Sequence, residues 1–167
     1  MSGTTPELRI VTYDPRYAGA FARLNLEWIE MFLEVEPRDT EVLEDPERII
    51  IDPGGEVFFL LQDGEPVGTV ALEVVEGGFE LIKMAVTPCL QGRGYGDRLM
   101  KAALDWARAR GGERLILYSN TRLEPAIRLY RKYGFRTVRT GSFAEWERAD
   151  ILMQLDLGSE PTEHEQT

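Results

Sequence analysis

The chain has 167 residues, of which 43% are hydrophobic and 29% are charged, a composition typical of one ordinary globular domain. Its 19 basic and 29 acidic residues leave a net charge of −10, which argues against nucleic-acid binding because that binding depends on Lys and Arg neutralising phosphates. One cysteine, Cys89, and one histidine, His164, exclude a disulfide scaffold and a zinc site of several cysteines, so we expect no metal.

The first half of the chain predicts a strand, a helical segment and a three-stranded meander. Residues 8–12 are strand-like, and apolar residues recur at helical spacing over residues 15–35, as one helix or two. The acidic stretch at residues 37–53 favours a short helix or loop near residues 46–51. Strands follow at residues 57–61, 67–75 and 79–86, with turns rich in glycine and proline between them.

The second half of the chain alternates helices with strands. An apolar stripe over residues 96–110 predicts an amphipathic helix that ends at Gly111. The predicted elements that follow are a strand at 115–118, a helix at 125–133 and strands at 135–139 and 150–157. Strands joined partly by turns and partly by helices imply an α/β domain on a mixed sheet. We expect a single domain over residues 1–157 and a disordered acidic tail over 158–167.

A glycine-rich loop, Gln91-Gly92-Arg93-Gly94-Tyr95-Gly96, leads from a strand into the helix predicted at residues 96–110. Its glycines permit a tight turn that directs several N–H groups into one concavity, and the helix dipole adds positive potential, which favours a phosphate. A P-loop needs Lys and Ser or Thr after the last glycine, where Asp97 and Arg98 stand, and a dinucleotide fingerprint needs a small residue at Asp97. The alternative is a plain tight turn.

Four linked motifs stand in a fixed order between residues 80 and 135. They are Lys83-Met84-Ala85-Val86-x-Pro88, Gln91-x-x-Gly94-x-Gly96, Ser119-Asn120 and Ala126-x-x-x-Tyr130-x-x-x-Gly134-Phe135. Together they resemble the GNAT superfamily of acetyl-CoA-dependent N-acetyltransferases. The resemblance implies a GNAT-like acyl-CoA N-acyltransferase fold, in which helices flank a central sheet that splays open between the strands at residues 80–86 and 114–119.

The resemblance also implies where acetyl-CoA binds as co-substrate. The pantetheine arm is expected to pair with the backbone of residues 84–86 as an added strand would, and the phosphates to bind the glycine loop. Asn120 offers an amide to the arm, or else opens an Asx turn. The expected cofactor-binding residues are therefore Met84, Ala85, Val86, Gln91, Gly92, Arg93, Gly94, Tyr95, Gly96, Asp97 and Asn120.

Two side chains are candidates for proton transfer. Tyr130 occupies the position of the family's general acid, where a phenol can protonate the departing thiolate; the alternative is a core aromatic residue. Glu80 is a candidate base because period-2 alternation puts it on the same strand face as Met84, or it is a strand-edge carboxylate paired with a neighbouring base. Glu73 and water remain rival bases. A main-chain N–H near Met84 or Ala85 is the expected oxyanion donor.

The charge is divided along the chain. Residues 27–56 hold eleven acids and two bases, whereas residues 91–139 hold twelve bases and four acids. Solvated helix faces are one explanation. With the resemblance, the basic segment favours attraction of the phosphorylated cofactor, and the acidic segment favours a cationic amine acceptor. No apolar run is long enough to span a membrane and residues 1–7 lack a basic-then-apolar leader, so we expect a cytoplasmic protein without a membrane partner.

The hypothesis is an enzyme that moves an acetyl group from acetyl-CoA to a primary amine, on a small molecule or a protein, by direct transfer in a ternary complex. Two alternatives stay open, a non-catalytic module that senses acetyl-CoA and an enzyme that transfers a longer acyl group. The sequence leaves the acceptor and the oligomeric state open, with a homodimer as one alternative.

Overall fold

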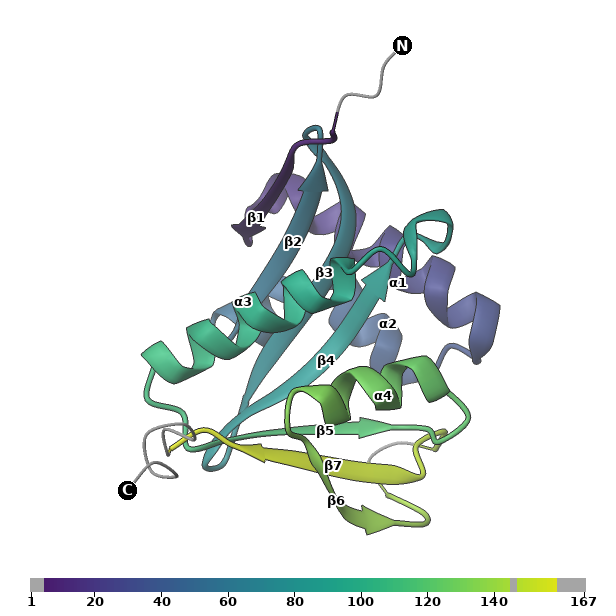
Figure 1. Ribbon diagram of the computed structural model, residues 1–167, viewed down its shortest axis with the longest axis vertical. Coiled ribbons are helices and arrows are strands. Elements are labelled where there is room, and N and C mark those ends of the chain that lie inside the picture. The colour runs from purple at the N-terminus through teal and green to yellow at the C-terminus, as the bar shows by residue number, and fades with distance from the viewer. Residues whose placement is uncertain (1–4, 145–146, 159–167) are drawn as a thin grey trace. The chain divides into compact units, whose positions relative to one another are not determined.

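The computed structural model describes residues 5–144 and 147–158, and Figure 1 shows its helices and strands. The strands are β1 (Leu8–Thr12), β2 (Glu56–Gln62), β3 (Glu65–Val75), β4 (Gly78–Val86), β5 (Arg114–Ser119), β6 (Arg136–Thr140) and β7 (Ile151–Asp156). The helices are α1 (Ala18–Phe32), α2 (Pro37–Glu44), α3 (Tyr95–Ala109) and α4 (Glu124–Lys132), with short turns η1 (Pro15–Tyr17), η2 (Glu47–Ile51) and η3 (Pro88–Leu90). Apart from Gly158, the predicted tail lies outside the described residues.

The seven predicted strands are all present, and the segment at residues 15–35 contains one α-helix, α1, after a 3-10 turn. The acidic stretch at residues 37–53 differs from the prediction because it forms α2 as well as the short π-helical turn η2. A capping box explains α2: the Glu36 side chain accepts from the Asp39 amide, while Asp39 accepts from the Glu36 amide. Pro37 at the first helical position adds a preset φ angle.

The strands are hydrogen-bonded in the order β1-β2-β3-β4-β5-β7-β6. The β1/β2, β2/β3, β5/β7 and β6/β7 pairs are antiparallel and β4/β5 is parallel, which confirms the predicted mixed sheet. Parallel pairing of neighbouring strands requires a crossover, and α3 is the helix between β4 and β5. In the described part of the chain, no helix is long and apolar enough to cross a membrane.

The chain divides into two compact units, each with its own packing. The first comprises Met1–Val74 and Ile82–Ala103, and the second comprises Val75–Leu81 and Leu104–Thr167. Strand β4 and helix α3 each contribute residues to both units. The glycine loop and residues 84–86 therefore belong to the first unit, whereas Glu80, Asn120 and Tyr130 belong to the second.

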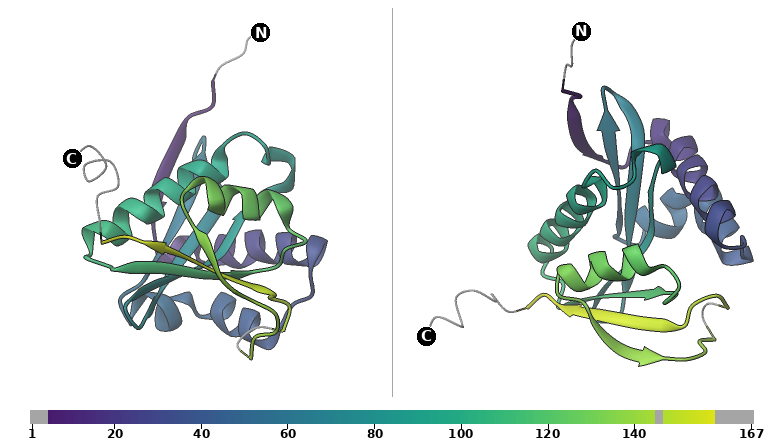
Figure 2. Two further views of the ribbon diagram at one scale, coloured as in Figure 1. Left: turned by 60° about the horizontal axis from the view of Figure 1, so that its bottom comes forward. Right: turned by 45° about the vertical axis from the view of Figure 1, so that its right-hand side comes forward.

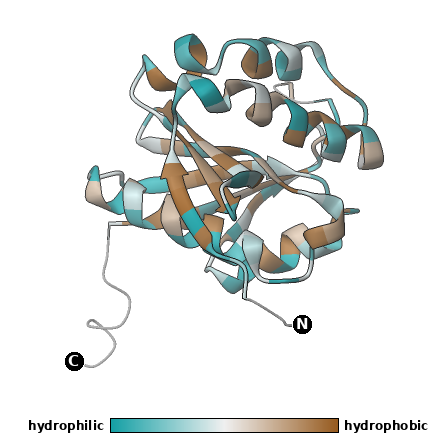
Figure 3. Ribbon diagram, turned by 90° about the horizontal axis from the view of Figure 1, so that it is seen from above, coloured by the Kyte–Doolittle hydropathy of each residue, from teal (hydrophilic) through white to brown (hydrophobic). Residues whose placement is uncertain are grey.

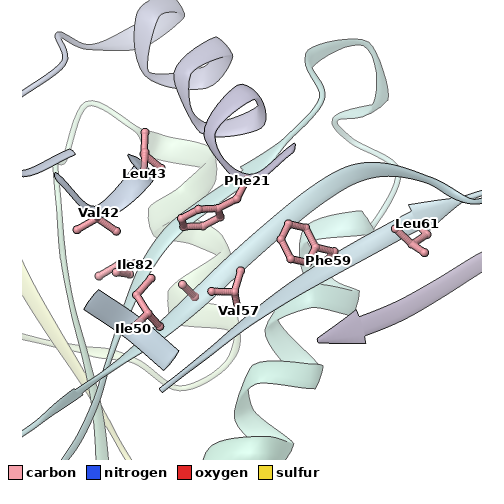
Figure 4. Packing of buried hydrophobic residues seen from close by; sticks show 9 residues of the cluster. Phe21, Val42, Leu43, Ile50, Val57, Phe59, Leu61 and Ile82 are labelled. Carbon is pink, nitrogen blue, oxygen red and sulfur yellow. The ribbon is translucent and has the colours of Figure 1, made fainter. Parts of the chain in front are cut away.

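The core of the first unit lies where α1 and α2 cover one face of β2, β3 and β4, while the start of α3 lies on the other face (Figure 2). Figure 4 shows the cluster beneath α1 and α2, made of Phe21, Val42, Leu43, Ile50, Val57, Phe59, Leu61, Ala71 and Ile82. Both faces of β2 are buried, so its apolar residues form an unbroken run, and Figure 3 shows brown residues gathered along the central strands. Each large side chain fully buried in this way stabilises the fold by about 1.5–3 kcal/mol.

Aromatic contacts in the second unit join β4 to α3 and β5 to the segment after β6. The rings of Phe79 and Trp106 meet edge to face at 5.2 Å, and those of Tyr118 and Phe143 meet at the same separation. Helix α4 ends before Gly134, whose φ of +99° is readily adopted only by glycine. A Cβ at Gly134 would lie 3.1 Å from the side chain of Leu155 on β7, so the chain also passes close to the sheet there.

Candidate active site

Residues 91–94 of the glycine loop are exposed, and the loop continues into the first turn of a 15-residue helix, α3. Gly92 and Gly94 have φ angles of +84° and +82°, and a Cβ at either position would meet no atom within 4 Å. One detail differs from the prediction, since the 3-10 turn η3 separates β4 from the loop. The first amides of α3 have no partner within the helix, so loop and helix start together fit the phosphates of acetyl-CoA.

One side-chain and one main-chain hydrogen bond connect the loop to the residues on either side of it. The side-chain amide of Gln91 donates to the Val86 carbonyl oxygen over 3.2 Å, and the main-chain N–H of Arg98 donates to the Gly94 carbonyl oxygen over 3.2 Å. Tyr95 is buried, and its phenol hydroxyl donates to Oε1 of Gln62 on β2. Its ring is thus part of the core, which leaves its backbone as the part that can face an anion. Arg93 is exposed, and Gly96 and Asp97 are half-buried in the first turn.

Strand β4 contains a left-handed residue directly before residues 84–86, where the cofactor arm was predicted to bind. Lys83 has a φ of +58°, a region that residues other than glycine rarely adopt and that inside a strand is typical of a bulge. Met84 and Val86 are half-buried and Ala85 is buried. Because strict alternation is interrupted at Lys83, the spacing of Glu80 and Met84 no longer shows by itself that the two side chains share one face of β4.

The two candidate carboxylates differ in surroundings. Glu80 is 7% exposed and is paired in register with Ile116 of β5. Glu73 on β3 forms an ion pair with Arg38 on α2, with an N–O separation of 3.3 Å. That pairing engages the carboxylate that a base would need, which weakens the case for Glu73. Glu80 as the base stays a prediction.

Tyr130 is 8% exposed on α4, and its ring meets that of Phe135 at 5.9 Å. Burial raises the pKa of Tyr130 to about 12, because the interior disfavours the phenolate. The phenol is therefore protonated at neutral pH, as a proton donor must be. The packing of its ring against Phe135 also agrees with the alternative that Tyr130 is a core aromatic residue.

Asn120, at the end of β5, is hydrogen-bonded within the second unit. Its amide donates to the Arg148 carbonyl oxygen over 2.6 Å, and its Oδ1 accepts from the Arg122 N–H over 2.9 Å. The next residue, Thr121, donates to both carboxylate oxygens of Asp150. The Asx-turn alternative is thus present, and contact with the cofactor stays a prediction. Over residues 5–144 and 147–158, no group of three or more His, Cys, Asp or Glu side chains could hold a metal ion.

An ion pair that the sequence did not indicate joins β4 to α2, directly before residues 84–86. The Lys83 ammonium donates to Oδ1 of Asp39 on α2, and the side chains are 5% and 0% exposed. A lysine between the apolar residues Ile82 and Met84 of a strand was the signal that could have suggested a buried partner, because Lys is rarely buried without one.

The comparisons with known proteins agree with this geometry. The family model described as "Acetyltransferase (GNAT) family" matches residues 21–135. A mycothiol acetyltransferase of Saccharomonospora viridis is 42% identical over 77 residues, which are 46% of this chain and 22% of that protein. An acetyltransferase of GNAT family from Staphylococcus aureus superposes with a TM-score of 0.81 at 18% identity, covering 90% of this chain and 99% of that one.

A second solved structure, a putative acetyltransferase of Salmonella typhimurium with its cofactor acetyl-CoA, has a TM-score of 0.72 at 18% identity and covers 92% of this chain and 96% of that one. At these identities the likeness concerns the fold. The chain spans less than a quarter of the length of the mycothiol acetyltransferase, so that protein's whole activity does not transfer to it. The family model, however, matches more than half of the chain and includes the glycine loop and Tyr130. The chain belongs to the GNAT acetyltransferase family.

Proposed function

We propose that this protein is an N-acetyltransferase that moves an acetyl group from acetyl-CoA to a primary amine by direct transfer in a ternary complex. The observation that carries the proposal is the exposed glycine loop, with Gly92 and Gly94 in left-handed conformations, at the start of α3. A loop of this kind offers main-chain donors and the positive end of a helix dipole, which suit a diphosphate. The structural relative from Salmonella typhimurium that contains acetyl-CoA supports the choice of anion.

The chain's own residues would bind and orient acetyl-CoA. The loop amides would hold the phosphates, and the exposed guanidinium groups of Arg93 and Arg98 would add positive charge there. The backbone of residues 84–86 would pair with the pantetheine arm in the manner of an added strand. The net charge of +8 over residues 91–139 would attract the anionic cofactor at long range.

When bound, acetyl-CoA supplies the acetyl group as a thioester. The neutral amine attacks the carbonyl carbon, a C–N bond forms, and the C–S bond breaks. A main-chain N–H near Met84 or Ala85 would stabilise the oxyanion. Tyr130 would give its proton to the departing sulfur, and Glu80, or water in its place, would take the proton that the amine releases.

The acceptor is proposed to be a cationic amine. Exposed carboxylates lie along α1 and the segment after it, at Glu27, Glu30, Glu41, Glu44 and Glu47. A surface with many negative carboxylates raises the local concentration of a cation and increases the rate at which the cation encounters the protein, an effect that salt weakens. The neutral, attacking form of the amine would then arise after binding, by loss of a proton.

The deciding experiment measures thiol release from acetyl-CoA across a panel of amines, with wild type, Tyr130→Phe and Tyr133→Phe compared. Release with at least one cationic amine is expected, with turnover lowered by Tyr130→Phe and kept by Tyr133→Phe, which removes a neighbouring phenol just past the end of α4. Binding of coenzyme A without release from any amine would favour the sensor alternative. Release from a longer acyl-CoA but not from acetyl-CoA would favour the longer donor.

A further inference from the structure

Lys83 and Asp39 form an ion pair that is almost fully removed from solvent. Lys83 lies on β4, and its ammonium donates to Oδ1 of Asp39 in the first turn of α2, 44 residues earlier in the chain. The Lys83 backbone has the left-handed φ of +58°. The same residue therefore carries a buried charge and an unfavourable backbone conformation.

Asp39 links the start of α2 to the sheet through both of its oxygens. Oδ2 accepts from the Glu36 N–H over 2.8 Å and so closes the capping box of α2, while Oδ1 accepts from Lys83. The neighbouring Arg38 pairs with Glu73 on β3. The first turn of α2 is thus connected by adjacent residues to β3 and to β4.

A left-handed residue other than glycine persists only where its surroundings hold it. Here the side-chain ammonium is fixed by a carboxylate that a helix cap itself orients, so the direction of the Lys83 side chain is determined by α2. The φ and ψ angles of Lys83 in turn set the directions of the next main-chain N–H groups, those of Met84 and Ala85. These are the groups assigned above to the oxyanion.

We infer that Asp39, acting through Lys83, holds the left-handed backbone of β4 and thereby orients the main-chain donors of Met84 and Ala85. Asp39 and Lys83 are positioning residues, since neither is assigned a contact with the reacting atoms. The inference rests on the proposed function, because it assigns a consequence for turnover to a conformation observed in the strand.

Two charge-free pairs test this role. Asp39→Asn/Lys83→Met removes both charges but keeps an L side chain at the left-handed position, whereas Asp39→Asn/Lys83→Gly puts there the residue that adopts that conformation without support. Asn at position 39 keeps an acceptor for the Glu36 N–H. The Met pair is expected to lower kcat by about tenfold or more while changing the KM for acetyl-CoA by less than about threefold. The Gly pair is expected to keep kcat within about threefold of wild type.

Arg38→Gln is the matched control, because it breaks the neighbouring ion pair from the same turn of α2 and leaves Lys83 untouched. It is expected to keep kcat. A Met pair with wild-type kcat, or a Gly pair that loses as much kcat as the Met pair, would overturn the inference. If the Met pair does not fold, the Gly pair decides, since retained kcat supports the inference and lost kcat contradicts it.

The 13Cα chemical shift of residue 83 provides a readout that does not depend on turnover. It is expected to report a left-handed residue in wild type and in the Gly pair, and an ordinary strand residue in the Met pair. If wild type releases no thiol with any amine, the proposed function fails. The chemical shift still shows whether the ion pair holds the backbone, and an unchanged left-handed signal in the Met pair would exclude that role.

Discussion

The phenol hydroxyl of Tyr95 donates a hydrogen bond to Oε1 of Gln62, which ties the first turn of α3 to the end of β2. Tyr95 directly follows the exposed part of the glycine loop, and its ring is buried. The loop is therefore anchored to the sheet at its helix end by a side chain, while its backbone remains exposed. Rigid support of this kind limits the conformational entropy that the loop loses when it binds an anion.

Tyr95→Phe should lower the free energy of unfolding by about 1–2 kcal/mol, because it leaves the side-chain carbonyl oxygen of Gln62 without this donor. Chemical denaturation of wild type and variant measures the difference. Tyr133→Phe serves as the control for loss of a phenol from the half-buried end of a helix. Equal stability of wild type and Tyr95→Phe would mean that the hydrogen bond contributes nothing net.

Gly94→Val should abolish coenzyme A binding measured by isothermal titration calorimetry. The side chain would occupy the space above the loop amides and would be strained at a φ of +82°. Gly111→Val is the matched control: Gly111 has a φ of +78°, a Cβ there would also meet no atom within 4 Å, and the residue follows the other end of α3. Both variants should lose about 1–2 kcal/mol of stability, but only Gly94→Val should lose binding. Binding retained in Gly94→Val would remove the assignment of the phosphate site.

The raised pKa of Tyr130 predicts a loss of stability in alkali. The folded state keeps the phenol proton up to a pKa of about 12, whereas the unfolded chain releases it near its ordinary value of 10.0. The unfolded state thus binds fewer protons between these values, so the contribution is complete below about pH 10 and is lost as the pH rises to about 12. A difference of two pKa units corresponds to about 2–3 kcal/mol.

Denaturation of wild type and Tyr130→Phe at several pH values between about pH 8 and about pH 12 measures this contribution, because this range includes the pKa of Tyr130 in the unfolded chain and reaches its pKa in the folded chain. The phenylalanine variant should lose less stability than wild type across that range. Equal losses in the two proteins would indicate that the Tyr130 phenol titrates at its ordinary value. In the proposed reaction, Tyr130 should stay protonated up to about pH 10, so its titration should not lower turnover below that pH.

Phe59→Ala should destabilise the first unit by about 3–5 kcal/mol, because it removes a fully buried ring from the cluster under α1 and α2. The Phe59 ring lies 5.2 Å from that of Tyr17 and 6.4 Å from that of Phe21. Val138→Ala on β6, where the side chain is 45% exposed, should change stability by less than about 0.5 kcal/mol. Thermal unfolding of both variants measures the difference between their losses of stability. Equal small losses would indicate that the cluster around Phe59 is poorly packed.

Asp39→Asn alone should lower the free energy of unfolding by about 3–5 kcal/mol, since it removes the carboxylate that pairs with the buried Lys83 ammonium. Adding Lys83→Met should recover most of that loss, because the apolar side chain no longer needs a partner in the interior. A double-mutant cycle by urea denaturation measures the coupling. Additive losses would show that the two side chains do not interact energetically.

Much of the fold could be predicted from local patterns. The strands, the stripe of α3 and the glycine loop each depend on residues within about a dozen positions of one another, where side-chain period and turn chemistry act directly. Helix α2 was missed because its cap depends on Glu36 and Asp39 acting together in an acidic stretch that has no clear apolar period. The left-handed Lys83 was missed for a related reason, since nothing in the residues next to it requires that conformation.

By itself, the sequence determined the mixed sheet, the glycine-rich loop before α3 and the family's motifs, because these follow from short-range spacing and backbone preference. Only the tertiary structure decided that Tyr95 faces the core, that Glu73 pairs with Arg38, and that Asp39 reaches Lys83. Partners distant in the chain meet only after helices and strands have packed. Burial then decides which charges must pair, because an isolated charge in the interior costs far more free energy than the same charge in water.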